Sequence, residues 1–514
     1  MHTKLTGCAG RLTILGLLLG SLATGAQSPP RNVVTRSGDR SVVLHWDRVA
    51  DADVAGYRVY RAMDPSGSFE AVTESVLPRS GFADLQVTNG MTYHYVVRTV
   101  NSDQEEGGDS ARVSVTPRPF ADDEAFLDYL QRTAFDYFWY EANPENGLIR
   151  DRSRPGAFCS IAAVGFGLTG LTIGIDRNWI TREQGRDRVL TTLRTFWEKR
   201  QGPDAVGTIG HKGWFYHFID METGVRFRNV ELSSIDTALL LAGILDVAAY
   251  FDGAHAEEVK IRELADAIYR RIDWHWMADG ADSLTHGWRP ESGFIPHRWL
   301  GYNEAMILYL LGLGAPEKPL PEKHWETWTE PYEWDESYGF GFVHFPPLFG
   351  HQYSHCWVDF RRIADAPMRA RGITYFENSR RATLAQRAYA IENPGGFAGY
   401  GSNVWGFTAS DSPGGYSARG APPGFNDDGT ITPTAPGGSL PFAPEVCLAA
   451  LRHLYDAFRE EIWTEYGFRD AFNLERDWWG PEVLGIDQGP ILIMAENYRT
   501  GVVWRRFMRI EAVR

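Results

Sequence analysis

Three acidic residues that lie far apart in the sequence each stand near the start of a strongly apolar segment. Glu231 directly precedes one such segment, Glu304 lies just inside a second, and Asp487 stands at the beginning of the last. Asp236 lies one helical turn beyond Glu231. Paired carboxyl groups can serve as a general acid and a general base, as in the hydrolysis of a glycosidic bond. The pattern therefore indicates acid–base chemistry, provided that the fold brings these side chains together.

Acidic residues are also favoured at helix N-termini for a purely structural reason. They accept hydrogen bonds from free N–H groups and suit the positive end of the helix dipole, which stabilises a helix by about 0.5–2 kcal/mol. Taken singly, each acid is explained equally well by capping. The loops before them are crowded with Trp, Tyr and Gly, which capping does not explain. We therefore favour a shared site.

The segment 324–360 holds the densest group of aromatic side chains. Twelve of its thirty-seven residues are aromatic, Trp334 and Trp357 among them. Prolines and polar residues interrupt the pattern, so we expect part of the segment to line a cleft and part to be core. Aromatic faces suit the C–H faces of sugar rings, while nearby polar groups bind hydroxyls. Both tryptophans are therefore candidate substrate-binding residues.

Three polar residues of the same region follow helical spacing. His351, His355 and Asp359 are four residues apart in turn, and Arg361 follows them. On one helix face such a set can hold a metal ion. No His-Glu-x-x-His pattern accompanies them, and a plain polar stripe has the same spacing. We therefore expect these four residues to bind carbohydrate, or to support side chains that do, and we assign no metal.

The elements that must position these residues are helices of two kinds. One kind keeps a polar face, which is typical of surface helices, and the other is apolar nearly all round, which requires burial. The first kind is expected at 122–142, 181–200 and 257–277, and the second at 158–175, 232–251 and 301–313. The two kinds alternate along the chain. That order predicts two concentric layers of antiparallel helix pairs.

Weaker helical patterns continue to the C-terminus. They cover 353–366, 376–391, 444–459 and 486–497, so that about six helix pairs fit after residue 121. No fixed-period repeat is present, which disfavours a solenoid. We therefore predict a mainly α (α/α)6 toroid over 121–511, with the N-termini of all inner helices on one face.

Residues 29–119 have a different pattern. Short alternating apolar runs at 42–46, 56–60 and 92–97 are separated by turn residues, which predicts a β-sandwich. The early Trp46 and the run from Gly90 to Tyr95 resemble a fibronectin type III domain. No acid pair or ligand cluster occurs here, so we interpret this part as a spacer or packing module.

Length and charge exclude several classes of protein. The chain has 514 residues, 43% of them hydrophobic, and carries 51 Lys+Arg against 66 Asp+Glu for a net charge of −15. This is a multidomain globular composition, not a disordered one. An acidic surface disfavours nucleic acids and anionic membranes as main partners. Neutral or cationic ligands stay open, and so does the oligomeric state.

Residues 1–26 match a secretory signal peptide. A short basic start, an apolar run over 12–22 and small residues follow one another. The run is too short to span a bilayer, so we expect an exported, periplasmic or secreted protein without membrane insertion. Cys159, Cys356 and Cys447 then remain. All three lie in apolar surroundings, which favours buried free thiols over a disulfide.

Four segments resemble the bacterial glucoamylase-like domain family, and the resemblance covers about residues 121–511. The segments are the histidine-aromatic run 339–361, the Glu-Leu-Ser-Ser-Ile-Asp segment 231–239, the Gly-Tyr-Asn-Glu segment 301–305, and the Gly-Ile-Asp-Gln-Gly-Pro segment 485–490. That family includes the β-1,2-glucan hydrolases of glycoside hydrolase family 144, which are inverting (α/α)6 barrels. The resemblance implies a hydrolase that acts on a neutral glucan, with β-1,2-glucan favoured, and that needs no cofactor or metal.

The resemblance also implies roles for the acids. Glu304 matches the family's Gly-Tyr-Asn-Glu glutamate and would be the general acid, while Asp487 would activate water. Glu231 and Asp236 would bind substrate or act as rival bases. Inversion requires carboxyl groups about 6.5–9.5 Å apart, and burial should raise the pKa of the acid.

Two other functions stay open. An (α/α)-barrel polysaccharide lyase would use Tyr or His with Arg on an acidic sugar, and its unsaturated products would absorb in the ultraviolet. A non-catalytic glycan-binding protein would leave the polymer intact. Whether cleavage is internal or from a chain end is also undecided.

Overall fold

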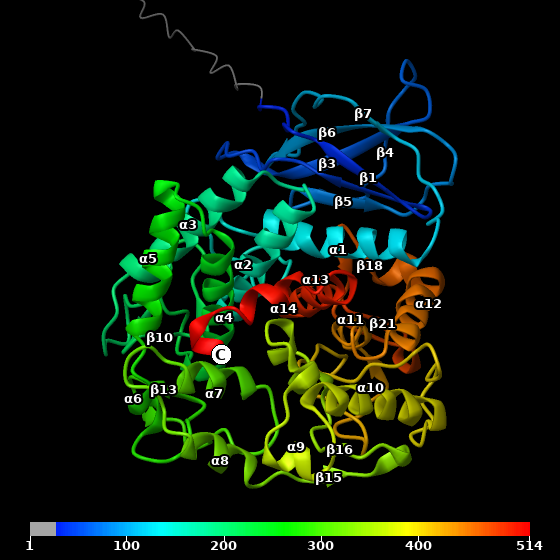
Figure 1. Cartoon of the computed structure of the whole chain (residues 1–514). Helices are drawn as coiled ribbons and strands as arrows, with labels where there is room; N and C mark the ends of the chain where they lie inside the picture. Colours follow the sequence, from blue (N-terminus) through cyan, green and yellow to red (C-terminus); the bar gives the residue numbers. More distant parts are fainter. Residues whose placement is uncertain (1–26) are drawn as a thin grey trace, which may run out of the picture.

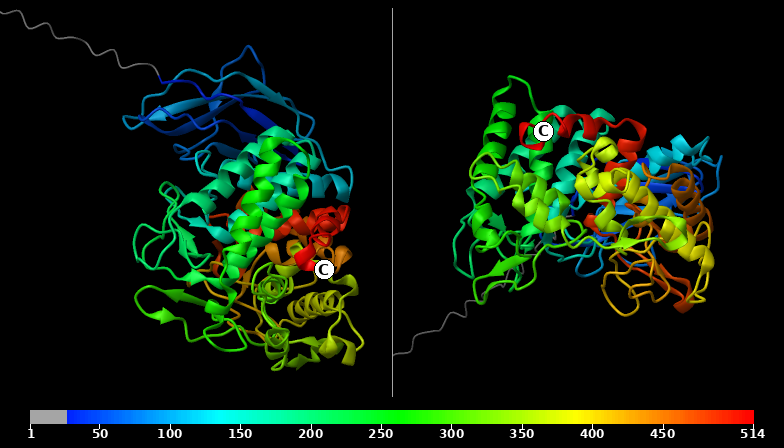
Figure 2. Two further views of the ribbon diagram at one scale, coloured as in Figure 1. Left: turned by 60° about the vertical axis from the view of Figure 1, so that its left-hand side comes forward. Right: turned by 60° about the horizontal axis from the view of Figure 1, so that its bottom comes forward.

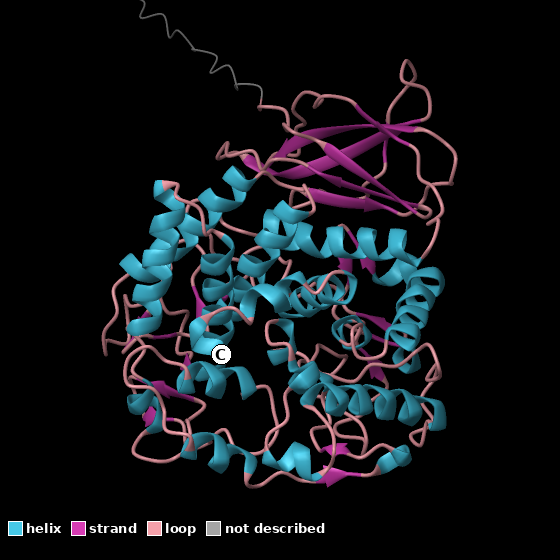
Figure 3. Ribbon diagram, in the orientation of Figure 1, coloured by secondary structure: helices cyan, strands magenta, loops and turns pink. Residues whose placement is uncertain are grey.

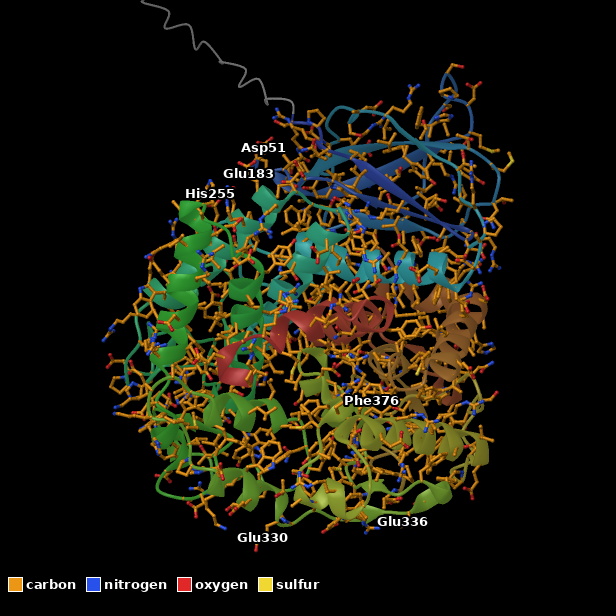
Figure 4. The ribbon with its side chains drawn as sticks, in the orientation of Figure 1. Asp51, Glu183, His255, Glu330, Glu336 and Phe376 are labelled. Atoms are coloured by element: carbon orange, nitrogen blue, oxygen red, sulfur yellow. The ribbon has the colours of Figure 1, made fainter. Side chains whose placement is uncertain are left out.

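The computed structural model describes residues 27–514, in which a β-rich N-terminal part lies against a helix-rich remainder (Figure 1). The expected signal peptide, 1–26, lies outside the described residues. The views from two further sides agree that the β-rich part covers one side of the helical part (Figure 2). Charged residues such as Asp51, Glu183 and Glu330 lie at the outer edge, whereas Phe376 lies inside it (Figure 4).

The N-terminal part consists of two antiparallel sheets. The first has three strands in the order β1 (Val34–Gly38), β2 (Ser41–His45) and β5 (Gly81–Asp84), and the second has four in the order β4 (Glu70–Ala71), β3 (Val54–Ala62), β6 (Tyr93–Asn101) and β7 (Val113–Val115). Trp46, Tyr57 and Tyr95 are buried in a separate apolar core between them. The two sheets therefore pack as a sandwich with a core of its own.

The rest of the described chain is mainly helical (Figure 3). Its helices are α1 (Asp123–Tyr140), α2 (Ile161–Asp176), α3 (Arg182–Glu198), α4 (Ser234–Tyr250), α5 (Ala256–Arg270), α6 (Trp274–Ala278), α7 (Met306–Leu313), α8 (Lys323–Thr329), α9 (Ala366–Ala370), α10 (Tyr375–Glu392), α11 (Thr434–Gly438), α12 (Pro444–Ile462), α13 (Gly485–Arg499) and α14 (Val502–Phe507). Helices α2 and α4 are buried along most of their length, while α3, α5 and α12 keep exposed faces.

The buried helices contact one another in the centre of this part. Helix α2 packs against α4 and α13, and α4 also packs against α7. Glycines allow the closest of these contacts. A Cβ atom on Gly165 would lie 2.3 Å from the carbonyl oxygen of Leu239, and one on Gly243 would lie 2.1 Å from that of Gly165. The backbones of α2 and α4 therefore touch.

Short ribbons occupy the loops between the helices. They are formed by β8 (Cys159–Ser160) with β11 (Phe218–Ile219), β9 (Gly210–His211) with β10 (Trp214–Phe215), β12 (Leu232–Ser233) with β13 (Gly287–Arg289) and β14 (Gly293–Phe294), β15 (Trp334–Asp335) with β16 (Phe342–Val343), β17 (Thr430–Ile431) with β20 (Phe472–Asn473) and β21 (Trp478–Trp479), and β18 (Trp463–Thr464) with β19 (Gly467–Phe468). Strands β8 and β12 run directly into α2 and α4. The ribbons therefore fix the chain where these buried helices begin.

Two helix predictions were wrong in their extent. The expected helix 301–313 begins only at Met306, because Gly301 has a φ of +74° and the following residues form a turn. The expected helix 353–366 is replaced by the 3-10 turns Ser354–Cys356 and Phe360–Arg362. There the carbonyl of Cys356 accepts a hydrogen bond from the Asn497 side chain instead of a helical N–H.

Polar contacts join the β-sandwich to α1 and α12. The Arg36 guanidinium forms two hydrogen bonds, of 2.7 and 3.0 Å, with the buried Asp136 carboxylate. The Ser41 hydroxyl lies 2.9 Å from the hydroxyls of both Tyr129 and Tyr455. Val43 belongs to the core of the helical part and not to that of the sandwich. The sandwich is thus packed onto the helices and is not a loose appendage.

All three cysteines of the described chain are buried and free, which confirms the expectation of free thiols. Within residues 27–514, no helix is long and apolar enough to cross a membrane.

Candidate active site

The four acids singled out in the sequence all stand where a buried helix begins. Glu231 precedes β12, Asp236 lies in the first turn of α4, and Asp487 lies in the first turn of α13. Glu304 was expected in the first turn of the helix 301–313. It lies instead in the turn immediately before α7, because that helix begins only at Met306. Because α4 contacts both α7 and α2, and α2 contacts α13, these helix starts belong to one packed group.

His217 joins two of the acids. Its Nδ1 lies 3.0 Å from Glu231 Oε1, and its Nε2 lies 3.5 Å from Asp236 Oδ2. Burial opposes a charge on His217, but the two carboxylates outweigh this effect and raise its pKa to about 9. The imidazole is therefore a cation at neutral pH, held between two anions.

Glu231 is correspondingly held as an anion. Its second oxygen accepts a hydrogen bond of 2.8 Å from Arg289 Nη2. Burial would raise the pKa of Glu231, but the hydrogen bond from His217 and the charge of Arg289 outweigh burial and lower the pKa to about 2. A carboxylate held this firmly is poorly suited to donate or accept a proton near neutral pH.

Glu304 has the opposite electrostatic surroundings. Its side chain is only partly exposed, and burial raises its pKa to about 7. The negative charge of Asp236 adds to the increase. A carboxyl group that keeps its proton near neutral pH is what a general acid requires.

Asp487 faces a second aspartate. Asp487 and Asp470 are 4% and 2% exposed, and their side chains are close enough to share a hydrogen bond. Within the described chain, Asp487 Oδ2 and Asp470 Oδ1 are buried without a hydrogen-bond partner. Burial and the charge of Asp470 raise the pKa of Asp487 well above its usual range, and burial raises that of Asp470 to about 7. Both aspartates therefore hold a proton to a higher pH than a free carboxyl group does.

The loops around this pair supply further charges. Asp470 Oδ2 accepts a hydrogen bond of 2.7 Å from the backbone N–H of Asp411. The Arg152 guanidinium contacts Asp151 at 3.1 Å, Asp411 at 3.1 Å and Glu482 at 2.8 Å. Arg152 thus holds together three loops that surround the aspartate pair.

Tyr353 connects Glu304 with Asp487. Burial raises the pKa of Tyr353 well above its usual value, and the nearby charges of Asp487 and Glu304 add to this effect. Its ring packs against those of Phe349 and Phe166, with centroids 5.4 and 5.6 Å apart. Both carboxyl groups are therefore close to one tyrosine, on an aromatic floor.

Tyr416 lies near the aspartate pair and is more exposed than the acids. It is 54% exposed, although burial of its hydroxyl and the charges of Asp487 and Asp470 raise its pKa well above its usual value. The side chains of His217 and Glu231 are also partly exposed, at 30% and 21%. Solvent therefore contacts the side of the site that holds His217, whereas Asp487 and Asp470 are buried.

Three residues predicted to bind substrate are buried instead. His351, His355 and Trp357 have no exposed surface. His351 is hydrogen-bonded to the Phe345 carbonyl and His355 to the Ser379 hydroxyl. Trp357 donates to the Thr169 hydroxyl. Burial lowers the pKa of His351 to about 3, so its ring is neutral. These predictions were wrong, because the segment packs as core beneath the site and cannot reach a saccharide.

Asp359 and Arg361 lie away from the acids. They form an ion pair of 2.6 Å, and the guanidinium covers the ring of Trp504 in α14, 4.8 Å from its centroid. Helix α14 follows the C-terminal end of α13, whereas Asp487 lies at the N-terminal end, about 18 Å away along the axis. The contact of this pair with substrate stays a prediction, at a place distant from Asp487.

Trp334 is accessible only in part. It lies in the ribbon β15–β16, and the Arg371 guanidinium covers one face of its ring, 4.4 Å from the centroid. Its ring is also partly packed against the core, and it stays a candidate.

Sequence reasoning missed His217, Asp470, Arg152 and Tyr416. None of them begins a helix, so the pattern that identified the other acids does not include them. Their shared signal is a position in the Gly- and aromatic-rich loops between helices. Among residues 27–514, no group of three or more His, Cys, Asp and Glu residues is arranged to hold a metal ion.

The chain is similar to several known proteins. The Glycoamylase family model, described as "Putative glucoamylase", matches residues 296–511. An exo β-1,2-glucooligosaccharide sophorohydrolase (non-reducing end) from Parabacteroides distasonis is 32% identical over 96% of this chain and 71% of its own length.

Solved structures of β-1,2-glucanases resemble this chain in fold. The crystal structure of a β-1,2-glucanase from Parabacteroides distasonis superposes with a TM-score of 0.85 at 30% identity, over 95% of this chain and 72% of that one. An endo-β-1,2-glucanase from Chitinophaga pinensis superposes with a TM-score of 0.69 at 30% identity, over 76% of this chain and 96% of that one.

Proposed function

This chain belongs to the glucoamylase-like family of β-1,2-glucan hydrolases, and from that premise we propose that it hydrolyses β-1,2-glucan by an inverting mechanism. Glu304 is the general acid and Asp487 the general base. The observation that supports this assignment is the place of the two carboxyl groups, Glu304 just before α7 and Asp487 in the first turn of α13, with the buried Tyr353 near both.

The proposed reaction uses the opposite protonation states of the two groups. Glu304, with a pKa of about 7, gives its proton to the glycosidic oxygen as the C1–O bond breaks. Water forms the new bond to C1 from the opposite face, and its proton passes to the ionised oxygen of the Asp470–Asp487 pair. The oxocarbenium-like transition state gains from the negative charge of that pair.

The other acids are assigned to substrate binding. Glu231 and Asp236 accept hydrogen bonds from sugar hydroxyls while His217 and Arg289 hold them in place. An ionised carboxylate is a strong acceptor for a hydroxyl donor. The exposed part of the Trp334 ring is a candidate for contact with a sugar ring.

We also propose that residues 121–511 form an (α/α)6 toroid. The outer layer comprises α1, α3, α5, α8, α10 and α12, and the inner layer α2, α4, α7, the 3-10 segment 348–356, α11 and α13. Contacts of α1 with α2, α4 with α5, and α11 with α12 support the pairing of outer with inner helices. The inner N-termini then meet at the acids.

Residues 1–26 are proposed to direct export. Fractionation of cells that express the full chain tests this, since the protein should be found outside the cytoplasm with the leader removed.

The substrate assignment is tested by incubating the protein with linear β-1,2-, β-1,3-, β-1,4- and α-1,4-glucans. With the wild type, reducing ends should rise on the β-1,2-linked polymer. With Glu304→Gln, they should not rise on the same polymer. NMR of the first products should show the α-anomer, as inversion of a β-linkage requires. A ladder of products indicates internal cleavage, and a single disaccharide indicates cleavage from a chain end. No release from β-1,2-glucan, or a β-anomer formed first, would contradict the proposal.

A further inference from the structure

One arginine of the β-sandwich reaches the loops that carry the acids. Arg79, just before β5, donates from Nε to the Glu465 carboxylate and from Nη1 to the Ser153 carbonyl, the latter at 3.0 Å. The side chains of Arg79 and Glu465 are 28% and 6% exposed. Arg79 therefore links two segments of the helical part that are more than three hundred residues apart in the sequence.

The first segment leads to Asp487. Ser153 directly follows Asp151 and Arg152, and it exchanges hydrogen bonds with Val483, of 2.9 Å from its backbone N–H and 3.0 Å to its hydroxyl. The Asp151 carbonyl accepts a further hydrogen bond of 2.9 Å from Gly485 N–H. The loop that Arg79 contacts is thus bonded to the chain that enters α13.

The second segment leads to Asp470. Glu465 lies in the turn between β18 and β19, five residues before that aspartate. The sandwich fits tightly around it: His45 Nε2 lies 3.2 Å from the Glu465 carbonyl oxygen, and a Cβ atom on Gly81 would lie 2.9 Å from Glu465 Cγ. The turn is therefore fixed from the sandwich side at both its backbone and its side chain.

We propose that Arg79 is a positioning residue, and that the β-sandwich through it sets the distance between the loop 151–153 and the turn that leads to Asp470. This inference rests on the proposed function of the Asp470–Asp487 pair. A guanidinium donates in fixed directions within one plane, so it can hold two acceptors at a set separation. Misplacement of a catalytic group by about 1 Å can cost roughly a hundredfold in rate.

Simple docking of the sandwich is the competing explanation, and Arg40 provides the matched control. Arg40 also joins the sandwich to the helical part, because its Nη2 lies 3.0 Å from Asp456 Oδ1 in α12. It contacts neither of the loops that Arg79 holds. If docking alone matters, loss of either arginine should have similar effects.

The experiment compares Arg79→Met, Arg79→Lys and Arg40→Met in the full chain. On β-1,2-glucan, Arg79→Met should lower kcat by about 10- to 100-fold with little change in KM. The acidic limb of its pH profile should also move, because the geometry of the aspartate pair changes. Arg79→Lys keeps a charge beside Glu465 but has one donor nitrogen in place of the planar pair Nε and Nη1, so its kcat should lie between those of Arg79→Met and the wild type. Arg40→Met should match the wild type.

Hydrogen exchange gives a readout that does not depend on activity. Peptides that cover 149–156 and 463–472 should exchange faster in Arg79→Met, and to a lesser degree in Arg79→Lys, but not in Arg40→Met. Unchanged exchange with wild-type kcat would overturn the inference, and so would an equal loss of activity in Arg40→Met. If Arg79→Met does not fold, Arg79→Lys decides between the same outcomes. If the wild type leaves β-1,2-glucan intact, the proposed function fails while the exchange data still test Arg79.

Discussion

Two groups of carboxyl side chains flank the site, and they differ in their neighbours. In the histidine group, His217 lies between Glu231 and Asp236, and Arg289 adds a second cation. In the aspartate pair, two carboxyl groups of like charge lie near each other, and within the described chain Asp470 Oδ1 and Asp487 Oδ2 have no hydrogen-bond partner.

The consequences for proton binding are opposite. The pKa of Glu231 falls to about 2 because the hydrogen bond and charge of His217 outweigh burial, whereas burial and the like charge of Asp470 raise that of Asp487. Each group contains one acid in the first turn of a buried helix, Asp236 in α4 and Asp487 in α13, so position relative to a helix does not decide the role of an acid. The neighbours decide it.

Glu304 lies between the two groups. The charge of Asp236, which belongs to the histidine group, adds to the increase in the pKa of Glu304. The charges of Glu304 and Asp487 both act on Tyr353. The comparison therefore predicts that proton transfer involves Glu304 and the aspartate pair, and that the histidine group binds substrate without exchanging protons.

The largest expected effect follows from removing the proton-transferring groups. Glu304→Gln and Asp487→Asn should each lower kcat by about 10²- to 10⁴-fold, because each removes one of the two proton transfers. Glu231→Gln should chiefly raise KM, since it removes a hydrogen-bond acceptor for substrate. Steady-state kinetics on β-1,2-glucan, with circular dichroism as the control for folding, measure this difference. A fall in kcat for Glu231→Gln as large as that for Glu304→Gln would break the comparison.

A smaller effect is expected when the aspartate pair is made asymmetric. Asp470→Asn removes the like charge beside Asp487 and supplies an N–H donor, so the pKa of Asp487 should fall. The acidic limb of the kcat/KM profile should then move to lower pH, and kcat should fall by roughly tenfold because a weaker base remains. Asp456→Asn, on the outside of α12, is the matched control. An unmoved acidic limb would mean that Asp470 does not share a proton with Asp487.

The fold was more predictable from the sequence than the site. Apolar patterns located α2, α4 and α13, because a helix that is buried all round must lack a polar face. The same patterns located four of the acids. They failed for His351, His355 and Trp357, because dense aromatic residues are as typical of a core as of a cleft.

The partners of the acids were beyond any local pattern. His217 is close to Glu231 and Asp236 only because β8 and β12 lie beside the strands around it, and Asp470 meets Asp487 from a loop after β19. Such contacts depend on how loops from different helix pairs fold over one another. Local periodicity carries no information on that arrangement.

The histidine group can be weakened without touching the proton-transferring residues. In His217→Asn, Asp236 loses its cation and its charge acts more strongly on Glu304. The pKa of Glu304 should therefore rise above 7 and shift the alkaline limb of the activity profile to higher pH, while KM rises several-fold. His255→Asn is the control, because His255 lies at the exposed start of α5 and asparagine also caps helices (Figure 4). An alkaline limb that stays in place would show that the two groups are not coupled through Asp236.

The smallest effect concerns stability and its dependence on pH. The pKa of Glu304 rises from about 4.5 in the unfolded chain to about 7 in the native protein, so the native state binds more protons between these values. Stability must therefore decrease as pH rises through this range, and glutamine at position 304 removes that loss. The free energy of unfolding can be measured with urea at about pH 5 and about pH 8. Between these two conditions, the difference between Glu304→Gln and the wild type should change by on the order of 2 kcal/mol in favour of the variant. Glu231→Gln should lose a nearly constant amount of stability at both pH values, because the stabilisation from the lowered pKa of Glu231 is almost complete above about pH 4.5, where the unfolded glutamate is also ionised. If Glu304→Gln also differed from the wild type by the same amount at both pH values, burial would not hold the proton on Glu304.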